Sequence, residues 1–424
     1  MDIEKTVERA VLVGLSADVY EASENATDAS MDELSELLMT AGGEEVARAI
    51  QHRHSPEAKT LIGKGKAEEI SQFVSENDIT LVVFDNELSP AQTKNLEDIM
   101  KVRVIDRSAL ILDIFASRAQ SREGKLQVEL AQYKYILPRL AGGSTSLSRL
   151  GGGIGTRGPG ETKLETDRRH IRNRISRLEE EINEVSRVRS EQRRARIKRE
   201  IPLVALIGYT NAGKSTLLNA LTGSDIHAEN RLFDTLDTTS RKFKISDTAE
   251  VILSDTVGFI RKLPHHLTRA FRATLEELLY ADLILHVVDI TNPDLLEHIE
   301  VTNDVIASLG ADKIPKLLVY NKCDLAENIS DYGRDENSVF ISAKTGEGRE
   351  ELCKAICKKL EKSERRASFT IPYDKAHLLD LLHRESKVLS LEYVAEGVML
   401  EAIVDDRIYG RITRELGGVS DDEF

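Results

Sequence analysis

The residues best suited to chemistry are eight consecutive ones, 208–215, which follow an apolar run and open a helical pattern. In order they are Gly208, Tyr209, Thr210, Asn211, Ala212, Gly213, Lys214 and Ser215. Glycines let main-chain N–H groups curl around phosphates, and the N-terminus of the following helix adds positive potential. Lys214 should reach the β- and γ-phosphates of a nucleotide, and Ser215 should place its hydroxyl on Mg²⁺. The sequence therefore predicts a phosphate loop.

A carboxylate that could serve the same metal ion ends the next apolar run. The motif consists of Asp255, Thr256, Val257 and Gly258. Asp255 can hold the Mg²⁺ shell through water, and the Gly258 N–H can meet the γ-phosphate. A lone Asp-x-x-Gly is usually only a turn, but its place at a strand end favours the functional interpretation.

A third motif can read the base of the nucleotide. It consists of Asn321, Lys322, Cys323 and Asp324, and the segment Ser342, Ala343 and Lys344 follows the next strand to complete the pocket. Asp324 can accept two hydrogen bonds from guanine, at N1–H and the exocyclic amine, whereas adenine offers no such pair. Because an unpaired carboxylate is costly, the pocket should reject ATP. Three motifs at the carboxyl ends of strands predict a GTPase.

These motifs need a sheet whose strands end at one edge. Strands are expected at residues 203–207, 251–253, 283–288, 317–320 and 339–341, with helices at 214–221, 269–280, 295–309 and 349–360. Strands and helices in this alternation predict an α/β fold with a mostly parallel, doubly wound sheet.

The 424 residues are enough for about three domains, and the pattern changes suggest four parts. Residues 1–115 alternate short apolar runs with helical patterns, which predicts a small α/β domain. Residues 116–200 form a basic hairpin with a glycine-rich loop, 201–365 the GTPase domain, and 366–424 a small α/β C-terminal domain.

The hairpin is predicted from apolar residues that recur every three or four positions on both sides of the loop. They are Leu126, Leu130, Tyr133, Leu137 and Leu140 before it, and Ile171, Ile175, Leu178, Ile182 and Val185 after it. This rhythm predicts two antiparallel helices. Arg149, Arg157 and Lys163 flank the glycines and are candidates for phosphate contact. The alternative is a solvated structural hairpin.

Charge is distributed unevenly along a chain whose formal net charge is −14. Residues 115–200 carry 20 Lys and Arg against 11 Asp and Glu, whereas the rest of the chain carries 38 against 61. A polyanionic partner such as RNA should therefore meet the hairpin.

Other classes of protein are disfavoured by composition. Three cysteines cannot build a disulfide framework for a chain of this size. The first residues lack the pattern of a signal peptide, and no apolar run reaches about 18 residues. We expect a cytoplasmic monomer with no membrane span.

Residues 201–365 resemble a GTPase of the translation-factor-like class. The rarer strings at 157–169 and 255–261 resemble the HflX family of ribosome-associated GTPases, and the likeness covers nearly the whole chain. It implies binding to the large ribosomal subunit, with the hairpin reaching toward ribosomal RNA. It also implies splitting or rescue of ribosomes, especially under stress. Part of the protein would then be ribosome-bound.

The resemblance also suggests roles for individual residues. Residues 235–239 resemble the first switch segment of the family, and the residues here expected to contact GTP are Phe233, Asp234, Thr235, Leu236 and Asp237. Thr235 is the candidate for the second protein ligand of Mg²⁺, with Thr238 and Thr239 as rivals. Thr238 stands where the family usually has Pro, which puts the rigidity of the loop in doubt.

Two further positions concern hydrolysis. Phe259 stands where many GTPases have a Gln that orients the attacking water. The catalytic group is therefore unknown, and we expect slow intrinsic turnover that the ribosome accelerates. Asn211 resembles the asparagine through which related GTPases bind an activating K⁺.

Two rival functions remain open at this point. One is an RNA-remodelling ATPase that uses the N-terminal domain, for which an ATP site is suggested by resemblance only. The other is a signalling GTPase with a protein partner and no RNA, which the basic segment disfavours.

Overall fold

The structure of the protein is a computed structural model. It describes residues 7–21, 24–140, 163–197, 201–223, 232–233, 239–245, 249–262, 278–326, 335–360, 364–375, 377–394 and 397–416. Contacts divide the chain into two compact units, Met1–Leu352 and Cys353–Phe424. The finer division into four domains stays a prediction. In the part of the chain that is described, no helix combines the length and apolarity needed to cross a bilayer.

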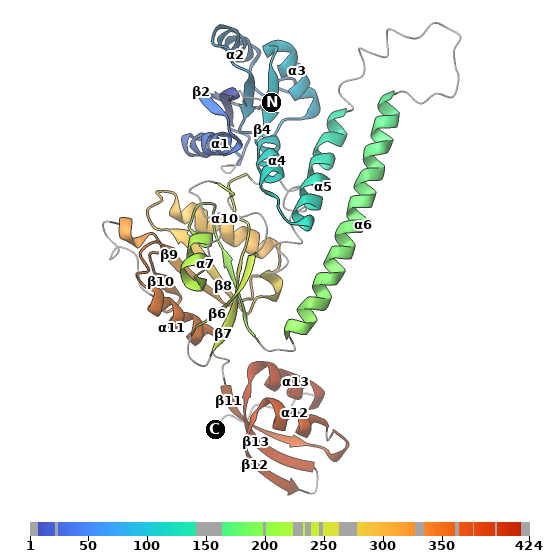
Figure 1. Ribbon diagram of the computed structural model, residues 1–424, viewed down its shortest axis with the longest axis vertical. Helices are drawn as coiled ribbons and strands as arrows, with labels where there is room; N and C mark the ends of the chain where they lie inside the picture. The colour runs from blue at the N-terminus through green and yellow to red at the C-terminus, as the bar shows by residue number, and fades with distance from the viewer. Residues whose placement is uncertain are drawn as a thin grey trace, which may run out of the picture. The chain divides into compact units, whose positions relative to one another are not determined.

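The N-terminal part is a parallel sheet covered by helices on both faces (Figure 1). Its strands, in the order β2-β1-β3-β4, are β1 (Arg9–Ala17), β2 (Glu44–Arg53), β3 (Leu81–Phe84) and β4 (Arg103–Asp106). Its helices are α1 (Asp28–Ala41), α2 (Lys64–Glu76), α3 (Pro90–Met100) and α4 (Arg107–Arg118).

Alternation along β1 separates the two cores of this sheet. Ala10 and Leu12 pack with α1 and α4, whereas Val11 and Val13 pack with α2 and α3. Successive side chains of a strand point to opposite faces, so a strand buried on both sides is apolar throughout. The small α/β domain predicted from the sequence has this architecture.

Two long helices pack side by side after α4 (Figure 1). They are α5 (Arg122–Arg139) and α6 (Lys163–Ile197). Leu126, Leu130 and Leu178 form the buried seam, with Tyr133, Ile175, Ile182 and Val185 partly buried around it. The predicted hairpin of helices is confirmed, and the spacing of apolar residues in the sequence located its seam.

The GTPase part is a six-stranded sheet in the order β10-β9-β8-β5-β7-β6. The strands are β5 (Leu203–Ile207), β6 (Thr239–Lys244), β7 (Glu250–Asp255), β8 (Leu283–Asp289), β9 (Lys316–Asn321) and β10 (Ser338–Phe340). All pairs are parallel except β6 with β7. The mostly parallel sheet is confirmed, and β6 was not predicted.

The helices of this part match the predicted ones where they are described. They are α7 (Lys214–Thr222), α10 (Leu295–Ser308) and α11 (Arg349–Leu360). Most of the helix expected at 269–280 lies outside the described residues. Its last three, Leu278–Tyr280, form a 3₁₀ turn.

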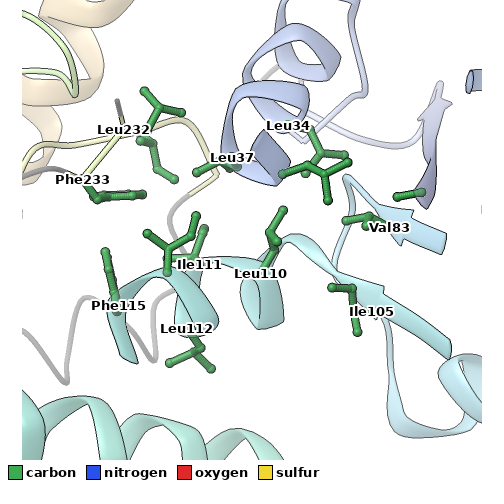
Figure 2. Packing of buried hydrophobic residues seen from close by; sticks show 14 of the residues in the cluster. Leu34, Leu37, Val83, Ile105, Leu110, Ile111, Leu112, Phe115, Leu232 and Phe233 are labelled. Carbon is green, nitrogen blue, oxygen red and sulfur yellow. The ribbon is translucent and has the colours of Figure 1, made fainter. Parts of the chain in front are cut away.

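A hydrophobic cluster joins the N-terminal sheet to the GTPase part. Figure 2 shows Leu232 and Phe233 lying over Ile111 and Phe115 of α4. The rings of Phe115 and Phe233 meet edge to face, with centroids 4.6 Å apart. Aromatic pairs of this kind add to the free energy gained from burial alone.

Charged groups are buried at the same interface. The Arg107 guanidinium is 1% exposed and forms ion pairs with Asp85 at 2.7 Å and Glu33 at 3.0 Å. Lys262 of the GTPase part also pairs with Asp85. A buried cation is tolerated only when counter-charges lie beside it, so this cluster fixes the pairing of the two parts.

The second unit contains a small antiparallel sheet, β11-β13-β12, with two helices on one face. Its elements are β11 (Glu364–Ile371), α12 (His377–Glu385), β12 (Lys387–Val394), β13 (Gly397–Asp405) and α13 (Asp406–Leu416). Because β11 begins at Glu364, the unit starts its own sheet just before the predicted boundary at residue 366.

Candidate nucleotide-binding site

The phosphate loop (residues 208–215) joins β5 to α7 in a backbone path that requires glycine. Gly208 and Gly213 have φ of 157° and 91°, in the region that side chains rarely adopt. A Cβ at Gly208 would lie 2.0 Å from the Val287 carbonyl oxygen, and one at Gly213 would lie 2.2 Å from Asn321 Nδ2. The glycines therefore allow β8 and β9 to approach the loop closely.

Main-chain carbonyl oxygens of the phosphate loop position the Lys214 ammonium. Its Nζ donates to the carbonyl oxygens of Gly208 at 3.1 Å and Tyr209 at 2.8 Å. An ammonium has three donors, so two main-chain bonds leave one N–H for a phosphate. Burial lowers the pKa of Lys214 to about 8, although nearby Asp255 opposes the shift.

Ser215 and Asp255 bring oxygen atoms together beside that lysine. Ser215 Oγ donates to Asp255 Oδ2 at 2.7 Å, which joins the start of α7 to the end of β7. A hydroxyl and a carboxylate are the ligand types that Mg²⁺ prefers, directly or through water. The donor set therefore fits a magnesium ion next to the phosphates.

The other residues of the second motif, 256–258, mainly support the position of Asp255 beside Ser215 and Lys214. Thr256 is fully buried and its hydroxyl donates to the Leu206 carbonyl at 2.7 Å. Val257 belongs to the interface cluster. A Cβ on Gly258 would lie 2.9 Å from Thr210 Cα and 3.0 Å from Lys214 Nζ, so its backbone borders the phosphate end of the site.

The Asn321 side chain connects three segments of the candidate site. Its side-chain nitrogen donates to the Ala212 carbonyl at 2.8 Å, and its side-chain oxygen accepts from the Ala343 N–H at 2.9 Å. The phosphate loop, the end of β9 and the segment after β10 are thus joined by one amide. The first and third motifs are joined in this way, whereas the second is joined to the phosphate loop by the bond between Ser215 and Asp255.

Asp324 follows Asn321 in the sequence and is exposed, so its carboxylate is accessible to a ligand. Lys322 adopts a left-handed backbone conformation and pairs with Asp289 at 2.7 Å. Cys323 and Ser342 are buried, while Lys344 is exposed. The motif thus presents one carboxylate outward and uses its other residues to support it.

Several predicted site residues are placed elsewhere or lie outside the described residues. Phe233 is 2% exposed and packs in the interface cluster, so its side chain serves the core. Asp234, Thr235, Leu236, Asp237 and Thr238 are outside the described residues, as are Arg149 and Arg157. Thr239 begins β6 opposite Asp255, and Lys163 begins α6.

Phe259 is also a core residue. Its side chain is 2% exposed and packs with Ile207, Ile284 and Ile306. It therefore cannot orient a water molecule. Its main chain instead pairs with the phosphate loop, because Thr210 N–H donates to the Phe259 carbonyl at 2.7 Å.

Sequence reasoning missed the contacts of Tyr209. Its hydroxyl donates to Glu33 Oε2 of α1 at 2.9 Å and accepts from the Arg261 N–H at 2.7 Å. Its ring stacks on His298 of α10, with centroids 3.6 Å apart. No local pattern could reveal them, since Glu33 and Tyr209 are 176 residues apart in sequence.

Comparisons with known proteins agree with this geometry. Three protein-family models match the chain: "GTP-binding GTPase N-terminal" at residues 28–116, "GTP-binding GTPase Middle Region" at 118–196 and "50S ribosome-binding GTPase" at 203–322. A protein named GTPase HflX from Caldanaerobacter subterraneus subsp. tengcongensis is 49% identical over 97% of this chain and 94% of its own. The chain belongs to the HflX family of GTPases.

Two further relatives of the same name extend the match. The HflX of Lacrimispora saccharolytica is 46% identical over 97% of each chain. That of Escherichia coli is 45% identical over 85% of this chain and 88% of its own. The resemblance seen in the sequence motifs is therefore confirmed at the level of the family.

The pKa of Lys214 predicts proton uptake when this HflX protein binds a nucleotide. With a pKa of about 8, roughly half of the Lys214 side chains are unprotonated at pH 8, and phosphates favour the ammonium form. Binding of Mg-GDP should take up about half a proton at pH 8 and about a tenth at pH 7. Affinity should accordingly fall as the pH rises through 8. Calorimetric titration in two buffers of different ionisation enthalpy measures the number of protons taken up. Equal proton uptake at pH 7 and pH 8 would contradict the prediction.

Proposed function

We propose that this chain binds GTP at the 208–215 loop with Mg²⁺, hydrolyses it, and associates with the large ribosomal subunit to split or rescue ribosomes. The main observation in favour of a nucleotide site is that the Asn321 amide joins the phosphate loop to the two segments proposed to bind the base, 321–324 and 342–344. Membership of the HflX family supports the activity. The protein would act as a monomer in the cytoplasm, in part bound to ribosomes.

Within this function each motif has a separate task. Lys214 and the loop N–H groups bind the phosphates, while Ser215 and Thr235 are the proposed protein ligands of Mg²⁺. Asp255 supports the metal through water. A bound Mg²⁺ would neutralise charge that develops on the phosphates during transfer.

Association with the ribosome is supported by two separate observations. The family model that matches residues 203–322 is described as a "50S ribosome-binding GTPase". The hairpin segment carries the excess of Lys and Arg described above, in a chain that is otherwise acidic. RNA-remodelling ATPase activity is not favoured, because the relatives are named GTPases.

Changing the base reader should change the base that is preferred. Asp324→Asn replaces an acceptor pair by an amide that can donate, so preference should move from guanine toward xanthine. GTP affinity should fall roughly 100-fold or more, because N1–H and the amine lose their partner. Competition of GTP and XTP for a fluorescent nucleotide measures the change.

Asp312→Asn is the matched control, since it removes one carboxylate from an exposed position of the same domain. It should leave both affinities at the wild-type level. If Asp324→Asn keeps the wild-type preference for GTP, Asp324 is not the base reader.

We also propose that Asn211 helps to bind K⁺. Asn211 lines a cavity of about 360 Å³ whose lining includes the carboxylates of Asp32, Glu33 and Glu36 from α1. Negative lining lowers the cost of placing a cation next to the phosphates. Hydrolysis should be faster in KCl than in NaCl of equal ionic strength, and Asn211→Ala should abolish the difference. Equal rates of GTP hydrolysis by the wild-type protein in KCl and NaCl would contradict the role of Asn211 in binding K⁺.

The loop of the hairpin should supply the RNA contacts. Changing Arg149, Arg157 and Lys163 together to Ala removes three cations, so affinity for the large subunit should fall. The slope of log affinity against log salt should become shallower by about 2, because fewer counterions are released. Intrinsic GTP hydrolysis should not change, whereas hydrolysis stimulated by ribosomes should drop. Co-sedimentation over a series of salt concentrations gives the slope.

A control triple variant separates local contact from net charge. Lys59, Lys64 and Lys313 are exposed and lie outside the hairpin, so their change to Ala removes the same charge. This control should retain the wild-type salt slope. Equal slopes for the two triple variants would show that the hairpin loop does not contact RNA.

A further inference from the structure

An ion pair connects the 321–324 motif to the end of β8. Lys322 Nζ pairs with Asp289 Oδ2 at 2.7 Å, and the two side chains are only 26% and 16% exposed. Asp289 lies opposite Asn321 in the register of β8 and β9, and the Ile290 N–H donates to the Asn321 carbonyl at 3.1 Å. Main-chain and side-chain contacts therefore join the two strand ends.

The Asp289 carboxylate is fixed by more than the lysine. Its Oδ1 accepts from the Thr291 N–H at 3.0 Å and from the Thr291 hydroxyl at 2.7 Å, while Oδ2 pairs with Lys322. An exposed ion pair contributes little, because two mobile side chains must be ordered to form it. Here the turn after β8 already orders one partner, so the ion pair mainly restrains the lysine.

Lys322 is also restrained at its backbone. Its φ of 65° lies in the left-handed region, which residues other than glycine adopt rarely and which the surrounding structure must stabilise. Backbone conformations of this kind cluster at ligand sites. A lysine fixed at its Cα and at its ammonium holds its four-carbon stem in one place, and such a stem offers an apolar surface.

Lys322 lies between the two groups that a nucleotide would span. Asn321, directly before it, bonds to the Ala212 carbonyl of the phosphate loop, and Asp324, two residues after it, is the proposed base reader. Asp289 and Ala212 line the same cavity. A nucleotide with its phosphates in the loop and its base at Asp324 would therefore pass beside the Lys322 stem.

A second carboxylate can attract the Lys322 ammonium. Partial burial, with Glu33 and Asp32 nearby, raises the pKa of Glu36 of α1, and Lys322 opposes that shift. Asp289 forms the direct ion pair. Without the charge of Asp289, the ammonium is left with a carboxylate on a different element, and the stem would no longer have one position.

We propose that Asp289 is a positioning residue for nucleotide binding, because it holds the Lys322 side chain where the stem packs on the purine ring. The inference rests on the nucleotide site proposed above, and it adds a residue that belongs to none of the three motifs. A stem that is ordered in advance loses little side-chain entropy when the base arrives. Asp289 thus acts on the nucleoside part of the ligand and not on the phosphates.

Asp289→Asn tests the proposal, because it removes the charge and keeps the shape of the side chain. Affinity for Mg-GDP should fall about 3- to 10-fold, the effect of having to order one long side chain on binding. The KM for GTP should rise by a similar factor, whereas kcat should stay within about twofold of wild type, because other residues bind the phosphates.

A double-mutant cycle with Lys322→Met separates positioning from a general structural role. Methionine keeps an unbranched apolar chain but has no ammonium for Asp289 to hold. In the Lys322→Met background, Asp289→Asn should therefore change the affinity for GDP by less than about twofold. A residue that only supported the end of β8 would cause the same loss in both backgrounds. Lys322→Met alone should weaken GDP binding about as much as Asp289→Asn, and it provides the test if Asp289→Asn does not fold.

Asp282→Asn is the matched control. The Asp282 carboxylate accepts from the Leu203 N–H at 2.7 Å and directly precedes β8, so it lies at the opposite end of that strand from Asp289. This variant should leave the affinity for GDP at the wild-type level.

Three results would overturn the proposal. They are an unchanged affinity for GDP in Asp289→Asn (in Lys322→Met, if Asp289→Asn does not fold), an equal loss in both Lys322 backgrounds, and a loss in Asp282→Asn as large as that in Asp289→Asn. Failure of the proposed nucleotide site is distinguishable, because Lys214→Ala would then bind GDP as well as wild type does. Dissociation constants from calorimetry give all of these comparisons.

Discussion

A fully buried guanidinium governs how the two halves of the larger unit fit together. Removing Arg107 from water would be prohibitive without counter-charges, and these come from Glu33 in helix α1 and from Asp85, which directly follows β3. Each carboxylate also accepts a second partner from the GTPase part. Asp85 takes Lys262, and Glu33 takes the Tyr209 hydroxyl. Charge neutralisation inside one domain therefore determines which residues of the other domain can approach it.

Within the GTPase part, the corresponding constraint is the close approach of three loops. Glycine at 208 and 213 allows β8 and the Asn321 side chain to come within contact distance of the phosphate loop. Asn321 then uses both ends of its amide on neighbouring backbones, so the site is rigid before any ligand arrives. Lys214 is aligned in the same way by two carbonyl oxygens. A site organised in advance loses little entropy when phosphates bind.

The sequence predicted those features that depend on local rules. Apolar runs located the five parallel strands, heptad-like spacing located the helical seam, and fixed motifs located the loops. It failed for β6, which is a polar edge strand with Phe243 as its one buried side chain and so lacks the expected alternation. It also failed for the domain interface. The residues that pair there are far apart in sequence, as Asp85 and Lys262 are. No local sequence pattern around one of them indicates which residue it pairs with.

For Phe259 the sequence predicted the role of the side chain correctly but gave no indication of the role of the main chain. The absence of Gln indicated that no side chain here orients water, and burial of the ring agrees with that. Its main chain, which no motif describes, bonds to the phosphate loop, and Arg261 N–H of the same segment donates to the Tyr209 hydroxyl. Because Lys262 of the same segment pairs with Asp85, one short stretch of chain connects the phosphate loop to the interface with the N-terminal part.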